Sequence, residues 1–234
     1  MYRAPSTPRL RCVASILSVN LAVPRPNPAK TVGITGIDKH PTAAPVQVRA
    51  PGPKGTGLGS GLVGDAIFDT AHHGGDDQAV YAYSREDLDA WQVELGRLLP
   101  GGVFGENLTT SGVDVTGALI GERWLVGAQV VLEVAEPRIP CGTFAHWMAE
   151  QGWIKRFTVR ALPGAYLRVI VPGDVRAGDP VAVLSRPDHD VTVGVTFRAL
   201  TREPELLPRL LSADALPQEV KELATRRTAP YPGE

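Results

Sequence analysis

The chain has 234 residues, with 24 basic and 25 acidic side chains and a net charge of −1. This balance argues against polyanion binding, so we expect no duplex nucleic acid as a partner. The hydrophobic fraction of 43% is enough for one true core with an extension beyond it. The two cysteines, Cys12 and Cys141, form neither a disulfide framework nor a zinc motif, which favours a reduced, cytoplasmic protein.

The N-terminal stretch loosely resembles a signal peptide, because arginines precede an apolar run. Asn20 interrupts that run, and Pro24, Pro26 and Pro28 follow where a small-residue cleavage site should lie. We therefore expect residues 1–13 to be a disordered leader and residues 14–23 to form the first strand. No segment reaches the length of a transmembrane helix, and no membrane partner is expected.

The composition predicts a mainly β protein of the α+β class, since 25 glycines and 21 prolines suit short strands joined by turns. One helix is expected to begin at Ser84, to bury Leu88, Trp91, Leu95 and Leu98, and to stop before Pro100. The sequence becomes helical again from Glu203 onward. Further strands are expected at residues 45–49, 79–83, 128–135, 165–171 and 180–184.

Several polar positions along the chain allow two interpretations. Lys39 is expected in a turn before the second strand, where it is either solvated or in contact with an anion. The turn at His72 and His73, followed by two glycines and close to four carboxylates, suggests either a metal site or local hydrogen bonds. Asn107 and Thr109 suit an Asx-type turn, or a loop that offers hydrogen bonds to a ligand.

Cys141 follows the strand predicted at 128–135, in the stretch Glu-Pro-Arg-Ile-Pro-Cys. Pro137 and Pro140 end that strand and stiffen the loop, because neither can donate to a β-ladder. Such a loop suits a sulfur that must be held at a fixed place. A buried free thiol is the alternative, since cysteine is among the most buried residue types. Both interpretations stay open at this point.

Six stretches, in order, resemble the MOSC domain family (molybdenum cofactor sulfurase C-terminal domain), in particular its stand-alone bacterial members. They are Thr35-Gly-Ile-Asp-Lys-His-Pro, Gly64-Asp65, His73-Gly-Gly-Asp, Phe104-Gly-Glu-Asn-Leu-Thr, Ile120-Gly121 and Pro137-Arg-Ile-Pro-Cys. The resemblance implies a β-barrel with peripheral helices over residues 14–190. It further implies a small helical C-terminal extension over residues 191–234.

The resemblance also implies a binding site. Cys141 would be the thiolate ligand of molybdenum in the molybdenum cofactor, and His73 would lie near the metal as a second catalytic residue. Lys39 and Arg138 would face the phosphate or the pterin edge. Asn107 and Thr109 would form hydrogen bonds with the pterin or line the substrate opening.

Relatives of this type reduce N-hydroxylated bases and amidoximes, so the resemblance implies an oxidoreductase with such a substrate. The chain has no cysteine cluster for an iron–sulfur centre, and we expect a separate electron donor, a flavin or iron–sulfur reductase. One alternative is a non-catalytic carrier of the cofactor, or of sulfur as a persulfide on Cys141. Another is a cysteine hydrolase in which His73 or His146 activates Cys141.

Overall fold

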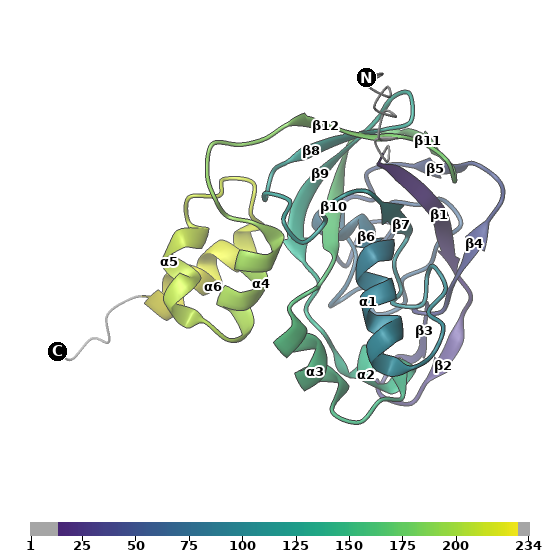
Figure 1. Ribbon diagram of the computed structural model, residues 1–234, viewed down its shortest axis with the longest axis horizontal. Coiled ribbons are helices and arrows are strands. Elements are labelled where there is room, and N and C mark those ends of the chain that lie inside the picture. The colour runs from purple at the N-terminus through teal and green to yellow at the C-terminus, as the bar shows by residue number, and fades with distance from the viewer. Residues whose placement is uncertain (1–13, 229–234) are drawn as a thin grey trace, which may run out of the picture.

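The computed structural model describes residues 14–228, and at its centre lies a sheet with the strand order β12-β8-β9-β10-β6-β7-β1-β4 (Figure 1). Within this sheet only β6 and β7 run parallel. The bounds are β1 Ser15–Ala22, β4 Lys39–Thr42, β6 Val80–Ser84, β7 Leu108–Ser111, β8 Arg123–Val126, β9 Val130–Pro137, β10 Ala165–Val171 and β12 Val181–Ser185.

Two further strand pairs and several helices surround this sheet. The pairs are β2 (Arg25–Asn27) with β3 (Gly33–Thr35), and β5 (Val46–Val48) with β11 (Gly173–Val175). The helices are α1 Arg85–Leu95, α2 Gly142–Met148, α3 Trp153–Arg160, α4 Val193–Thr201, α5 Leu207–Leu210 and α6 Gln218–Thr228, with 3₁₀ turns η1 Asp76–Gln78 and η2 Pro204–Leu206. The expected α+β class is confirmed.

The expected β-barrel is not closed, because the ladder over residues 14–228 has β12 and β4 at its ends. One edge of β1 meets two different segments, β4 and the residues just before β12. Its second half, Val19–Ala22, pairs with β4, and its start meets Pro180 through an isolated bridge. There the Ile16 amide donates to the Asp179 carbonyl oxygen at 2.9 Å. Because this bridge is antiparallel, β12 runs on from Pro180 past the start of β1 and not along it.

Helix α1 begins where the sequence predicts, but it ends earlier. The Ser84 hydroxyl accepts a hydrogen bond from the Asp87 amide at 3.1 Å, as an N-cap does. The helix stops at Leu95, because Gly96 adopts a left-handed φ of 65°. Leu98 therefore lies beyond the helix and is 86% exposed, and Leu99 is buried in its place. The expectation that Leu98 faces the core was wrong.

Two helices follow Cys141 that the sequence did not predict, namely α2 and α3. They carry Phe144, Trp153 and Phe157 into an aromatic cluster that also contains Trp91 and Phe104. The Trp91 and Trp153 ring centroids lie 4.8 Å apart, and Phe104 meets Phe144 edge-on at 5.2 Å. This cluster fixes the start of α2, and therefore Cys141, against the sheet.

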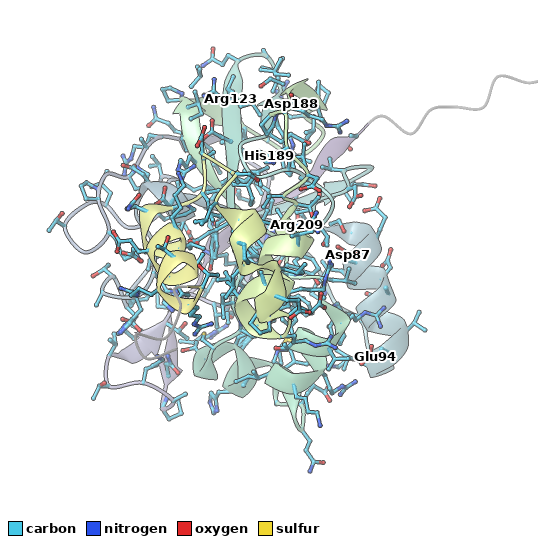
Figure 2. The ribbon with its side chains drawn as sticks, turned by 90° about the vertical axis from the view of Figure 1, so that its left-hand side faces the viewer. Asp87, Glu94, Arg123, Asp188, His189 and Arg209 are labelled. Atoms are coloured by element: carbon cyan, nitrogen blue, oxygen red, sulfur yellow. The ribbon has the colours of Figure 1, made fainter. Side chains whose placement is uncertain are left out.

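The C-terminal helices pack on the other hydrophobic cluster, which is mainly aliphatic and lies along the sheet. Figure 2 shows α4, α5 and α6 from their own side, in front of the strands. Helix α4 begins at Val193, ahead of the start expected at Glu203. The predicted leader, residues 1–13, lies outside the described residues, as do residues 229–234. No helix within residues 14–228 has the length and apolar character needed to cross a membrane.

Candidate functional site

A cavity of about 120 Å³ lies between the sheet and the loops around Gly36 and Ala66. Five of the six predicted site residues line it: Lys39, His73, Asn107, Arg138 and Cys141. Segments that are distant in the sequence thus meet at one place, as the family motifs implied. Apolar side chains, among them Ile34, Ile67 and Phe68, form another part of the wall.

Cys141 lies between the end of β9 and the start of α2, with a free and partly buried thiol. Burial raises the pKa of this thiol and is the largest single influence. A hydrogen bond with His73, the charge of Arg138 and the Phe144 amide act in the opposite direction and together outweigh it. The net result lowers the pKa of Cys141 from 9.0 to about 6, so that the thiolate dominates at neutral pH.

Arg138 is a buried cation, 7% exposed, at the inner wall of the cavity. Its guanidinium lies 3.9 Å from the Phe144 ring centroid and donates a hydrogen bond to the Phe104 carbonyl oxygen. Within residues 14–228 it forms no ion pair with a carboxylate, although arginine stays charged at any ordinary pH. A buried charge without a carboxylate partner is costly, and the anion that Arg138 meets at this wall is the Cys141 thiolate.

Lys39 is the first residue of β4 and is 8% exposed, which corrects its expected place in a turn. Its ammonium donates to the Asp65 carboxylate. The same carboxylate accepts from the Ser60 hydroxyl at 2.7 Å and from the Asn107 amide nitrogen at 2.9 Å. Burial lowers the pKa of Lys39, while the attraction of Asp65 works against this shift. Asp65 thus orients two of the predicted residues toward the cavity.

His73 reaches the cavity from a turn that only glycine permits. Gly74 and Gly75 both have φ near 83°, and a Cβ on Gly74 would lie 2.7 Å from the Gly59 carbonyl oxygen. His72 points away, is exposed, and binds Asp69 at 2.7 Å. Within the described residues, no group of three or more His, Cys, Asp or Glu side chains is placed to hold a metal ion. The histidine turn therefore positions His73 and forms no metal site by itself.

Thr109 does not line the cavity, in contrast to the other predicted residues. It lies on β7 with its hydroxyl buried, where it donates to Glu106 at 3.0 Å and accepts from the Asn20 amide at 3.0 Å. Strand alternation turns this side chain inward, so its hydroxyl serves the packing of the sheet. His146 is exposed on α2 and does not line the cavity either, which leaves His73 as the histidine beside Cys141.

The sequence did not single out Tyr81 and Tyr166, which complete the polar wall. The two tyrosines are cross-strand partners on β6 and β10, and their ring centroids lie 5.0 Å apart. Each lies in an apolar strand and resembles a core residue by composition. The register of β10 against β6 would be needed to place them at the cavity.

The residues at this cavity fit the molybdenum cofactor that the resemblance implies. A thiolate is a soft ligand that suits a metal of this kind, and Arg138 and Lys39 supply positive charge for anionic groups. The volume of about 120 Å³ is smaller than the ~300–1,000 Å³ of pockets that enclose a whole ligand. The cavity therefore accommodates only part of a pterin-sized group.

Fold and cavity together define a mixed α+β protein with a low-pKa thiol beside buried cations. Comparison with known proteins agrees, because the MOSC domain matches residues 69–182. The uncharacterized protein YflK of Bacillus subtilis is 30% identical over 206 residues, which cover 86% of this chain and 89% of YflK. The chain therefore belongs to the MOSC domain family.

Solved structures show the same fold. The crystal structure of YiiM from Geobacillus stearothermophilus superposes with a TM-score of 0.73 at 25% sequence identity, and the match covers 92% of this chain and 100% of that chain.

A protein of Gibberella moniliformis named "Reductase" is 31% identical over 131 residues. The matched part is 55% of this chain but only 23% of the fungal protein.

Proposed function

We propose that this protein binds the molybdenum cofactor through Cys141 and reduces N-hydroxylated compounds such as hydroxylamino bases and amidoximes. The observation that carries the proposal is the low-pKa thiol of Cys141, which shares one cavity with the buried guanidinium of Arg138. Membership of the MOSC family and the similarity to a fungal protein named as a reductase support it.

In this proposal each cavity residue has a role that its environment suits. The Cys141 thiolate is the protein ligand of the metal, and His73 holds it by a hydrogen bond. Arg138 and Lys39 bind anionic groups of the cofactor, and Asp65 keeps Lys39 and Asn107 in place. When bound, the cofactor supplies the two-electron redox chemistry.

The overall reaction converts R–NH–OH into R–NH₂ and water, with uptake of two electrons and two protons. The N–O bond breaks, the nitrogen is reduced, and the oxygen leaves as water. Since the sequence contains only two cysteines, fewer than the four ligands of an iron–sulfur centre, the electrons come from a separate protein. A flavin or iron–sulfur reductase is the class of donor that fits.

A second candidate function uses the same thiol without reduction. The positive charge beside Cys141 would also stabilise a persulfide on this residue, so that Cys141 carries sulfur. Alternatively, the protein carries the cofactor to another enzyme. Such a carrier contains cofactor or sulfane sulfur but reduces no N-hydroxylated compound with any electron donor. A cysteine hydrolase, in which His73 activates Cys141, is distinguished by ester or amide cleavage without molybdenum.

The test is reduction of an amidoxime by protein purified from a host that makes the cofactor, with reduced viologen dye as electron source. We expect the wild-type protein to form the amidine and Cys141→Ala to lose this activity. Cys12→Ser is the control, because it removes the other cysteine and should retain activity. A molybdenum-containing wild-type protein that forms no amidine contradicts the reductase and favours the carrier.

A further inference from the structure

Tyr166 lies on the cavity wall, yet none of the roles above uses it. It belongs to β10, where its cross-strand partners are Tyr81 on β6 and Glu136 on β9. Side chains that are directly opposite in a sheet point to the same face. The three residues therefore form a row across the sheet, beside Cys141 and Arg138.

The hydroxyl of Tyr166 differs from those of the neighbouring tyrosines. Tyr81 donates to the Pro163 carbonyl oxygen at 2.7 Å, and Tyr83 donates to the Leu162 carbonyl oxygen at 2.7 Å. Within residues 14–228, Tyr166 has no hydrogen bond of this kind. Burial is the largest influence on its hydroxyl and raises the pKa of Tyr166 to about 12, while the charge of Arg138 works against this shift. The hydroxyl therefore keeps its proton at neutral pH and lies at the cavity as a hydrogen-bond donor.

Next to the first cavity lies a second one, of about 410 Å³. Glu136 lines that second cavity and Tyr166 lines the first, while Gln78 lines both. The Gln78 side-chain amide donates to Glu136 at 2.8 Å and fixes the carboxyl in this position. The cross-strand pair of Glu136 and Tyr166 therefore has one member at each cavity.

The surroundings of Glu136 keep a proton available there. Burial, followed by the nearby charges of Asp77 on η1 and Glu219 on α6, raises the pKa of Glu136 to about 7, while Gln78 and Lys54 work against this shift. Asp76 also lines the second cavity. At neutral pH Glu136 exchanges its proton readily, as a relay group must.

We propose that Tyr166 is the proton donor of the candidate site and that Glu136 renews its proton from the second cavity. The proposal rests on the proposed function, since it assigns the protons that N–O reduction consumes. The Tyr166 hydroxyl protonates the oxygen that leaves nitrogen. The protonated Glu136 carboxyl then renews the proton of the tyrosinate through water, since no direct hydrogen bond joins the two side chains within residues 14–228, and the Glu136 carboxylate takes up a proton from the second cavity. The electrons come from the separate flavin or iron–sulfur donor.

The first test compares single-turnover reduction of an amidoxime by cofactor-loaded variants. Tyr166→Phe removes only a hydroxyl without a partner, so it should fold and keep its molybdenum, yet react about 100-fold more slowly or worse. Tyr83→Phe is the matched control, because its hydroxyl does not line the cavity, and it should react like wild type. We expect the wild-type rate to decline above pH 7 as Glu136 loses its proton, and Glu136→Gln should slow turnover and remove this decline.

The second test needs no cofactor. Infrared spectra of the cofactor-free protein should show a carboxylic acid band that grows as the pH falls through about 7 and is absent in Glu136→Gln. The band should shift in Tyr166→Phe and stay unchanged in Tyr83→Phe. Reduction by wild type at the same rate as by Tyr166→Phe, or a band insensitive to Tyr166, overturns the proton path alone. Loaded wild type that reduces no substrate overturns the proposed function and the path with it.

Discussion

At the scale of single residues, the chemistry of the site depends on the pKa of Cys141, which burial raises and neighbouring polar groups lower. Burial alone would keep the thiol protonated, since it raises the pKa. His73 and Arg138 reverse this effect, and both belong to segments that other contacts hold in place. His73 is held by the turn at Gly74 and Gly75, and Arg138 is held by the Phe144 ring and the Phe104 carbonyl oxygen.

Removal of the His73 imidazole should therefore raise the pKa of Cys141 from about 6 toward the ordinary thiol value. The rate of alkylation by iodoacetamide, measured against pH on cofactor-free protein, reports this directly, because only the thiolate reacts. In His73→Ala the rate should rise at a higher pH than in wild type. His72→Ala is the control, since His72 is exposed and bound to Asp69. Equal midpoints in wild type and His73→Ala would exclude the hydrogen bond as a cause.

The sequence predicted these site residues to different degrees, for physical reasons. The motifs brought Cys141, Arg138 and His73 to one cavity because each follows a Pro or precedes a Gly that fixes the backbone. The resemblance implied that Thr109 contacts the pterin or lines the substrate opening, but its hydroxyl is buried in the sheet, and a strand residue changes side with a shift of one position. Tyr166 was missed for the same reason, since its role depends on the register with β9 and β6.

At the scale of elements, helices α2 and α3 could not be predicted from the local sequence pattern. The stretch from Gly142 to Arg160 is interrupted by Ala149 and Gly152 in left-handed conformations, so no long helical periodicity develops. The two short helices are stable because aromatic side chains anchor them. Phe157 lies parallel to Trp91 at 6.1 Å and meets Phe144 edge-on at 5.2 Å. Tertiary packing, which the sequence does not display, decides this segment.

Phe157→Ala should lower the free energy of unfolding by about 3–5 kcal/mol, because it leaves a cavity among fully buried rings. Val159→Ala on the same helix is the control, since Val159 is 56% exposed and should change stability by less than about 0.5 kcal/mol. Urea denaturation followed by circular dichroism measures both. Similar small losses in the two variants would show that the aromatic cluster does not anchor α3.

At the scale of the whole molecule, helix α4 connects the two hydrophobic clusters. Its Phe197 belongs to the aromatic cluster around Trp91, while its Val193 and Ala199 belong to the aliphatic cluster along the sheet. Residues 191–234 are, in our proposal, an extension of the unit formed by residues 14–190. The shared core means that neither part buries its apolar surface alone. Over the described residues the sheet has β12 and β4 at its ends, and the bridge between Ser15 and Pro180 links β1 to the start of β12.

The shared core predicts that residues 14–228 unfold in one transition. Tryptophan fluorescence reports on both clusters, because Trp91 and Trp153 lie in the aromatic one and Trp124 in the aliphatic one. Its urea transition should coincide with the transition of far-ultraviolet circular dichroism, as two-state unfolding requires. Two separate transitions would show that the C-terminal helices unfold independently of the sheet.

The central claim is that Cys141 holds molybdenum, and the metal content of the purified protein tests it most directly. Wild-type protein from a host that makes the cofactor should contain molybdenum and pterin in equal amounts, and Cys12→Ser should match it. Cys141→Ser should retain its fold but lose nearly all of its molybdenum, since an alcohol does not replace the thiolate of Cys141. Equal molybdenum per chain in wild type and Cys141→Ser would contradict the account.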